Sequence, residues 1–261
     1  MTAFDRTTRL APDAGRAGRS SIELDESWAS LRGVHGGYLT ALAVRAAEAE
    51  LEHRAVRTVA MSFLRPTNPG PATFDVVETR SSRSFSTYEV TISQGDRIGA
   101  VARITATSPV EGSSWDNSEP VDILPPELCI PLEPPEGIRH FGHAEALLDP
   151  THLPFTHAAA ARVGGHVRPL ERREIDAAWL AMILDWFPPS PFTRVDPPTG
   201  GVSIDYTVHL HRTLPPLRDG QWLGGSFRAD VSEGGIALEH GTILDPDGRI
   251  LAESFHTRWT G

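Results

Sequence analysis

The 261-residue chain contains no lysine, and all 24 of its basic residues are arginine. A guanidinium group stays protonated and cannot act as a nucleophilic amine. This absence excludes Schiff-base chemistry, Ser–Lys dyads and a phosphate-loop lysine, since each of them requires an amine. The sequence also lacks the Gly-x-Ser-x-Gly pattern of serine hydrolases and the Gly-x-Gly-x-x-Gly pattern of dinucleotide sites.

Cysteine, positive charge and long apolar runs are also scarce. Cys129 is the only cysteine, so no disulfide can form within the chain. No stretch approaches the roughly 20 apolar residues that a membrane-spanning helix needs, and residues 1–9 lack the apolar core of a signal peptide. A formal net charge of −10 argues against a general nucleic-acid-binding protein. We therefore expect a cytoplasmic protein with neither nucleic-acid nor membrane partners.

Two local arginine clusters occur, in residues 54–65 and in residues 168–173. Either cluster could bind one phosphorylated small molecule despite the overall negative charge. The alternative interpretation, favoured for both, is ordinary solvated surface charge.

The order of predicted elements repeats along the chain. Residues 1–20 are polar and are expected to be frayed. The first half predicts a strand at 22–24, a helix at 36–54, and strands at 57–64, 72–80, 85–93 and 98–107. Seven prolines between residues 109 and 138 predict a linker without regular structure. The second half predicts a strand at 158–163, a helix at 174–187, and strands at 202–212, 221–231, 235–244 and 249–259.

This order predicts an α+β protein made of two similar units. We assign residues 1–110 to an N-terminal unit, 111–150 to a proline-rich linker and 151–261 to a C-terminal unit. An overlay of the two predicted helices supports a duplication. When His35 is placed on Asp176, Tyr38 falls on Trp179 and Val44 falls on Asp185.

Asp185 is the only ionisable residue in the apolar run 179–187. A carboxylate in the last turn of a helix opposes the helix dipole, so local stability does not explain it. Burial among small and apolar neighbours would raise its pKa and suit a general base. The alternative is that Asp185 reaches solvent at the end of the helix.

His35, Gly36 and Gly37 begin the first predicted helix. The first N–H groups of a helix have no partner within it, and glycine lets a ligand approach them closely. These amides are candidates to stabilise an oxyanion. A plain helix-entry turn is the alternative.

Residues 203–211 alternate as a strand does, with Ser203, Asp205, His209 and His211 on the face opposite Tyr206. Asp205, His209 and His211 could in principle bind zinc. The three positions are spread too far along an extended strand to favour this, so we expect a polar solvent or interface face and no metal.

At this point the chain resembles the hotdog-fold thioesterases, in particular the double-hotdog acyl-CoA thioesterase II family. The resemblance covers residues 20–260. It rests on Trp28 and the segments 34–38 (VHGGY), 63–66 (FLRP), 184–186 (LDW), 203–212 (SIDYTVHLHR) and 247–254 (DGRILAES). It implies two tandem hotdog units, each a long helix wrapped by an antiparallel sheet.

The resemblance also implies catalytic roles. In that family an aspartate of the second helix, a threonine or serine at the head of a strand, and a glutamine of the last strand direct water at the thioester. Asp185 and Ser203 match the first two positions, whereas the third position holds His256. An imidazole can replace the hydrogen bonds of an amide and can also titrate near neutral pH, which predicts a sharper pH dependence. A half-exposed surface histidine is the alternative.

The resemblance implies one active site per chain, between the halves. The His35-Gly36-Gly37 turn would face Asp185, whereas the mirror pair, Asp176 and Val44, has neither the glycines nor the acid. It further implies substrate binding by the His35–Tyr38 turn and an apolar acyl channel. The expected channel residues are Trp28, Tyr38, Trp179 and Trp186. No cofactor is expected.

These features predict a thioesterase of fatty acid metabolism that hydrolyses acyl-CoA or acyl-carrier thioesters to the free acid and the thiol. A homo-oligomer is plausible because sheet edges often pair between chains. Two alternatives stay open. One is a hydratase or dehydratase of the same fold, although the aspartate-to-histidine hydratase signature is not visible. The other is an acyl-CoA-binding protein that has lost catalysis, for which His256 is the main support.

Overall fold

The computed structural model describes residues 1–109, 112–196 and 201–260. The helices are α1 (Ala3–Thr7), α2 (Gly36–Glu48) and α3 (Ala177–Ile183), with the short 3₁₀ helices η1 (Glu26–Trp28), η2 (Pro126–Leu128), η3 (His140–His143) and η4 (Ser190–Thr193). The strands of the first half are β1 (Ala11–Pro12), β2 (Arg19–Leu24), β3 (Ala29–Ser30), β4 (Gly33–Val34), β5 (Ala55–Phe63), β6 (Gly70–Ser81), β7 (Phe85–Gln94) and β8 (Arg97–Thr107). Those of the second half are β9 (Ile130–Pro131), β10 (Ala144–Leu148), β11 (Ala161–Pro169), β12 (Val202–Leu210), β13 (Leu223–Glu233), β14 (Ile236–Leu244) and β15 (Ile250–Trp259).

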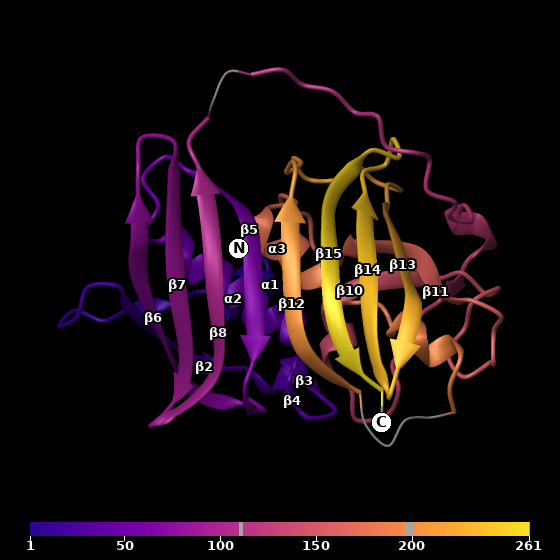
Figure 1. The fold of residues 1–261 in the computed structure, drawn as a ribbon, viewed down its shortest axis with the longest axis horizontal. Helices are drawn as coiled ribbons and strands as arrows, with labels where there is room; N and C mark the ends of the chain where they lie inside the picture. The colour runs from indigo at the N-terminus through magenta and orange to yellow at the C-terminus, as the bar shows by residue number, and fades with distance from the viewer. Residues whose placement is uncertain (110–111, 197–200, 261) are drawn as a thin grey trace.

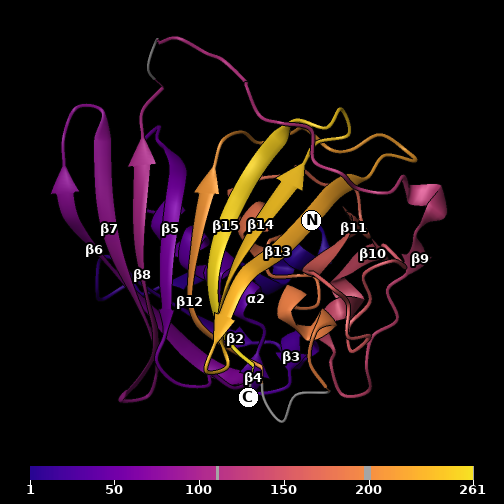
Figure 2. The same ribbon diagram turned by 45° about the vertical axis from the view of Figure 1, so that its right-hand side comes forward.

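One antiparallel sheet runs through both halves, in the order β1-β2-β6-β7-β8-β5-β12-β15-β14-β13-β11-β10-β9. The halves meet where β5 pairs with β12, with Met61 opposite Tyr206. In Figure 1 these two strands lie side by side at the centre, and α2 and α3 lie behind them. Figure 2 shows the C-terminal strands curving around the helices. Each half therefore has the predicted α+β hotdog arrangement, and the double hotdog fold is confirmed.

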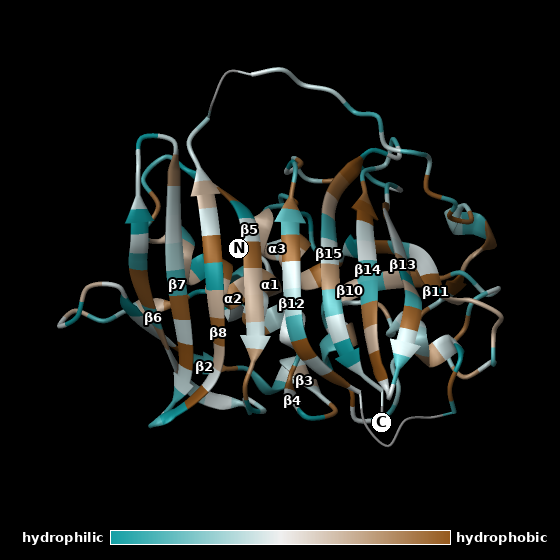
Figure 3. Cartoon of the chain, viewed as in Figure 1, coloured by the Kyte–Doolittle hydropathy of each residue, from teal (hydrophilic) through white to brown (hydrophobic). Residues whose placement is uncertain are grey.

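The strands follow the predicted alternation, and Figure 3 shows hydrophobic and hydrophilic residues alternating along them. In β12, Tyr206 and Val208 are fully buried while Thr207 and His209 are partly exposed. The Tyr206 hydroxyl donates a hydrogen bond of 2.9 Å to the carbonyl of Ala181 in α3. This bond ties the central strand to the helix behind it.

Both helices are shorter than predicted. α2 ends at Glu48 instead of residue 54, and His53 has a positive φ of 55° that no helix continues through. α3 starts at Ala177 because Ile175 is held in a β-bridge to Leu214. Asp185 consequently lies just beyond the last helical residue, not in the last turn.

The prediction of a frayed N-terminus was wrong. Residues 3–7 form α1, and Phe4, 3% exposed, packs edge-on against Trp28 and Trp179. Asp5 forms an ion pair of 2.6 Å with Arg173. An apolar anchor and a partly buried charge pair together offset the entropy of ordering this segment.

The linker is only partly irregular. Figure 1 shows the chain after β8 arcing over one end of the sheet toward the C-terminal half. Residues 144–148, assigned to the linker from the sequence, instead form β10 and pair with β11. The proline density correctly predicted the absence of regular structure in residues 112–125. β10 follows the last of these prolines, so its backbone N–H groups are free to pair. Residues 110–111 lie outside the described part.

The N-termini of the two long helices are equivalent. The Nδ1 atom of His35 accepts the Tyr38 N–H at 3.3 Å, and the Oδ1 atom of Asp176 accepts the Trp179 N–H at 2.9 Å. Both side chains are therefore N-caps that accept from the third helical residue. This equivalence supports the overlay of His35 on Asp176.

Candidate active site

The C-terminal end of α3 meets the N-terminal end of α2, and this contact brings Asp185 to the predicted His35-Gly36-Gly37 turn. The Gly37 N–H donates to Asp185 Oδ2 at 2.9 Å. His35 Nδ1 is occupied as an acceptor by the Tyr38 N–H, so its Nε2 carries the proton and donates to the Asp185 carbonyl at 2.8 Å. Asp185 is 8% exposed, so the interpretation of a solvent-facing aspartate was wrong.

Gly37 is required for this close approach. A Cβ atom at position 37 would lie 2.5 Å from the Met182 carbonyl oxygen and 3.1 Å from Asp185 Cβ. The backbone of α3 provides the nearer obstacle, so the two helices would have to separate.

We expect Gly37→Ala to lower both activity and the free energy of unfolding, the latter by about 1–3 kcal/mol as for other overpacked sites. Urea unfolding and thiol release measure the two effects. Gly112→Ala is the matched control, because a Cβ at that position meets nothing within 4 Å. Equal stability of the two variants would contradict the close helix contact.

Gly36 and Gly37 differ in their availability as oxyanion donors. The Gly37 N–H is already used by Asp185. Gly36 is the first residue of α2, so its N–H has no acceptor within the helix, and none is found elsewhere in the described residues. The Cβ position of Gly36 lies 3.0 Å from Asp185 Oδ2. Of the two predicted amides, Gly36 is the free one.

The sequence analysis missed a buried arginine at the site. Arg258 Nη2 lies 3.1 Å from Asp185 Oδ1, and Arg258 Nε lies 2.7 Å from Glu239 Oε1. Glu239 also accepts the N–H of Ser190. The sequence did contain a sign of this contact. Arg258 lies two residues after His256, so the two side chains are on the same face of β15.

The predicted rise in the pKa of Asp185 was wrong. Burial on its own raises the pKa of this carboxyl. The charges of His35, His256 and Arg258 oppose burial and lower the pKa to about 2. Because burial lowers the pKa of His35 and His256 themselves, the lasting positive charge near neutral pH is that of Arg258. Asp185 is therefore an ionised carboxylate.

His256 lies beside Asp185 and is not a surface residue. It is 1% exposed, and its Nδ1 is 3.5 Å from Asp185 Oδ1. Within the described chain neither ring nitrogen has a hydrogen-bond partner. Burial and the charge of Arg258 lower its pKa to about 3. The predicted titration near neutral pH is therefore wrong.

A β-bulge decides where Ser203 points. The pairing of β12 with β15 shifts between Ser203 and Asp205, so Ser203 lies opposite Arg258 while Tyr206 lies opposite His256. Residues directly opposite in an antiparallel pair point to the same side. Ser203 thus shares the inner face with Tyr206, and the predicted strict alternation was wrong at this position.

A second missed group comes from the segment assigned to the linker. The ring of His140 stacks on His35 at 4.1 Å between centroids and contacts Trp186 edge-on at 5.5 Å. Burial, with His35 beside it, lowers the pKa of His140 to about 2. A proline-rich segment gave no indication that its end covers the site.

The predicted acyl-channel residues are all buried, but they lie in two places. Trp28 and Trp179 pack on Phe4, and Tyr38 stacks on Trp28 at 4.5 Å. Phe4 therefore fills the space between the two tryptophans. Trp186 is different, because it contacts His35 at the site.

The mirror position holds ion pairs in place of a second catalytic group. Asp176 Oδ2 lies 2.7 Å from Arg45 and 2.7 Å from Arg173. Val44, the counterpart of Asp185, is fully buried. These contacts support the prediction of a single site per chain.

The zinc candidates of β12 bind other partners. Asp205 accepts from Thr257 at 3.0 Å, and His211 lies 2.9 Å from Glu253. In the described ranges no group of three potential metal ligands is present. Nor does any described helix have the length and apolar character needed to cross a membrane.

The fold and the site together define a double-hotdog thioester hydrolase. The family model of the acyl-CoA thioesterase N-terminal domain matches residues 24–108, and that of the acyl-CoA thioesterase C-terminal domain matches residues 124–259. The chain therefore belongs to the acyl-CoA thioesterase family.

Solved structures share the whole fold at low sequence identity. A hot dog fold protein of unknown function from Alicyclobacillus acidocaldarius is 20% identical, with a TM-score of 0.89, over 100% of this chain and 98% of that chain. A candidate thioesterase II from Thermobifida fusca is 22% identical, with a TM-score of 0.87 over the same shares. An acyl-CoA thioesterase II from Mycobacterium marinum is 19% identical, with a TM-score of 0.77 over 100% and 97%. No curated protein matches the chain.

Proposed function

We propose that this hydrolase cleaves acyl-CoA or acyl-carrier thioesters to the free acid and the thiol, using water held by Asp185. One observation carries the proposal: a buried carboxylate, a free helix N-terminal amide and an unpartnered imidazole converge from both halves of the chain. A buried polar atom without a partner costs about 1–3 kcal/mol. A water molecule that hydrogen-bonds a ring nitrogen of His256 beside Asp185 would remove that cost.

The geometry supports distinct roles. Asp185 stays ionised and orients the water, with His256 and Ser203 as further hydrogen-bonding groups. The thioester carbonyl oxygen would lie at the Gly36 N–H, which stabilises the negative charge that develops there. The water oxygen bonds to the carbonyl carbon, the C–S bond then breaks, and the proton released by water ends on the thiolate. None of these steps requires a metal or a redox cofactor.

The pKa values predict a flat pH profile. Asp185 has a pKa of about 2 and His256 one of about 3, so Asp185 is ionised and His256 neutral at any pH well above these values. The pH profile of kcat/KM reports the pKa values of groups in the free enzyme. Since neither Asp185 nor His256 titrates between about pH 5 and pH 8, we expect kcat/KM to stay constant over that range. Stopped thiol-release assays over this range measure it. An acid limb near pH 6–7 would show that one of these groups is exposed or unpaired in solution.

The first test is thiol release from a series of acyl-CoAs of graded chain length. Turnover of any member supports the proposal, and the preferred length reports the volume available to the acyl group. Absence of thiol release from every acyl-CoA and acyl-carrier substrate would contradict it.

A second candidate is acyl-CoA binding without turnover. It is favoured by the ion pair to Arg258, because a carboxylate with a pKa of about 2 is a poor general base. Tight binding of an acyl-CoA with neither thiol release nor hydration of an enoyl-CoA would establish this candidate. Hydration without thiol release would instead establish a hydratase.

A further inference from the structure

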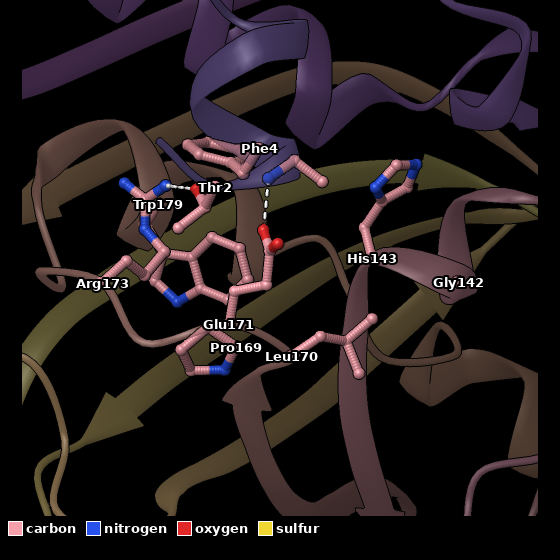
Figure 4. Close-up of a pocket in the computed structure, with 10 residues that line it drawn as sticks. Thr2, Phe4, Gly142, His143, Pro169, Leu170, Glu171, Arg173 and Trp179 are labelled. Carbon is pink, nitrogen blue, oxygen red and sulfur yellow. Dashed lines mark hydrogen bonds between the residues drawn. The ribbon is translucent and has the colours of Figure 1, made fainter.

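A cavity of about 330 Å³ lies on the N-terminal side of α3, away from Asp185. We call it the arginine cavity. It is lined by residues 168–170, 172 and 173, at the end of β11 and just after it, by residues 217–221, which precede β13, and by Glu145 of β10. It shares Pro169, Leu170 and Arg173 with the neighbouring apolar pocket drawn in Figure 4, where Arg173 reaches Thr2.

Two of the four arginines that line the arginine cavity are already paired. Arg173 is 6% exposed and is bound by Asp5 and Asp176, so its charge is used inside the protein. Arg168 lies 2.7 Å from Glu145. These two residues form the wall of the cavity and are not its free donors.

The other two arginines are free. Arg172 and Arg218 are exposed, and neither side chain has a partner among the described residues. Asp219 is the only carboxylate of the lining apart from Glu145, so two unpaired cations face one acid. The lining is therefore positive in a chain whose net charge is −10.

The cavity wall is held in place by specific contacts. The guanidinium of Arg168 lies 4.0 Å from the centroid of the Trp222 ring, a cation–π contact. The Arg218 N–H donates to Gln221 Oε1 at 2.8 Å, which shapes the turn through Gly220, where φ is +80°. The free guanidinium groups are thus attached to an ordered frame.

We propose that the arginine cavity binds a phosphate group. Guanidinium groups present planar pairs of N–H donors that match phosphate oxygens and keep their charge at every physiological pH. The segment 168–173 is one of the two clusters that the sequence marked as able to meet a phosphorylated small molecule. The other cluster does not converge, because Arg54, Arg57 and Arg65 donate to three separate backbone carbonyls.

The phosphate could come from two sources. One is the nucleotide end of coenzyme A, in which case the inference rests on the proposed function. The other is a separate phosphorylated molecule that binds at a distance from Asp185. Both molecules would bind through the same guanidinium–phosphate contacts. One measurement must therefore test whether the cavity binds phosphate, and a second must test which molecule carries that phosphate.

The site is tested by titrating the full chain with inorganic pyrophosphate and with coenzyme A, and binding is monitored by calorimetry and by tryptophan fluorescence. We expect saturable binding of both, weakened about tenfold or more in the double variant Arg172→Gln, Arg218→Gln, since both free guanidinium groups are lost. Arg83→Gln, an exposed arginine outside the cavity, is the matched control and should bind as the parent does. Equal affinity of the double variant and the parent, or no saturable pyrophosphate binding, would overturn the proposal.

The source is tested by comparing the KM of an acyl-CoA with that of the matching acyl-pantetheine, which has no phosphate. If the cavity holds the nucleotide, the double variant raises the KM for acyl-CoA alone and leaves kcat unchanged. If the phosphate belongs to another molecule, pyrophosphate binding falls while both KM values stay the same. The titration does not depend on turnover, so failure of hydrolysis and failure of the phosphate site are distinguishable.

Discussion

Asp185→Asn is expected to lower kcat/KM for acyl-CoA hydrolysis by about 10²- to 10³-fold, the usual cost of removing one preorganised electrostatic group from a site that excludes bulk water. Asparagine keeps the shape of the side chain and can still accept the Gly37 N–H through its amide oxygen. What it loses is the negative charge that orients the attacking water. Thiol release under single-turnover conditions measures the chemical step directly.

The matched control for this variant is Asp176→Asn at the other end of α3. Asparagine is an equally good N-cap, so the bond from the Trp179 N–H is kept. The mirror position holds arginine ion pairs instead of a catalytic group, so hydrolysis should persist. Comparable losses in the two variants would contradict a single site at Asp185. If the Asp185→Asn variant kept its activity, a group other than the Asp185 carboxylate would have to orient the attacking water.

The sequence predicted most of the strands because each half alternates apolar and polar residues with the period of a half-buried strand. It also predicted the meeting of His35 with Asp185, 150 residues apart, through the duplication and the family resemblance. Element ends were less accurate, as in α2, because helix ends depend on local caps and on where the next strand must start. The N-terminal residues are ordered because Phe4 packs against Trp28 and Trp179. These partners come from distant segments of the chain, so the sequence pattern did not reveal the contact.

The charge state of the site could not be predicted, and the reason is physical. A pKa depends on which charges surround a group in space, and Arg258 approaches Asp185 only because β15 and α3 pack together. Burial raises the pKa of Asp185, and Arg258 is one of the groups whose charge lowers it. Likewise, Ser203 faces inward only because of a bulge that the alternation did not reveal.

Arg258→Met is expected to have the largest effect on stability. Methionine fills much of the same volume but carries no charge, so the carboxylates of Asp185 and Glu239 would remain buried without their cation. Removing one partner of a buried ion pair costs about 3–5 kcal/mol. Urea unfolding measures this loss. Arg228→Met is the control, because that side chain and its partner Asp230 are 53% and 78% exposed, so their ion pair should contribute only about 0–1 kcal/mol.

The same variant should also change the pH dependence of hydrolysis. With Arg258 gone, burial raises the pKa of Asp185, so the ionised form is lost at a higher pH and an acid limb enters the kcat/KM profile. If Arg258→Met does not fold, the double variant Arg258→Met, Glu239→Gln carries one buried charge fewer and provides the same readout. A flat profile together with unchanged stability would show that Arg258 does not control the charge of Asp185. An acid limb that appears only when Arg258 is removed would show that this arginine, absent from the sequence prediction, keeps the catalytic carboxylate ionised.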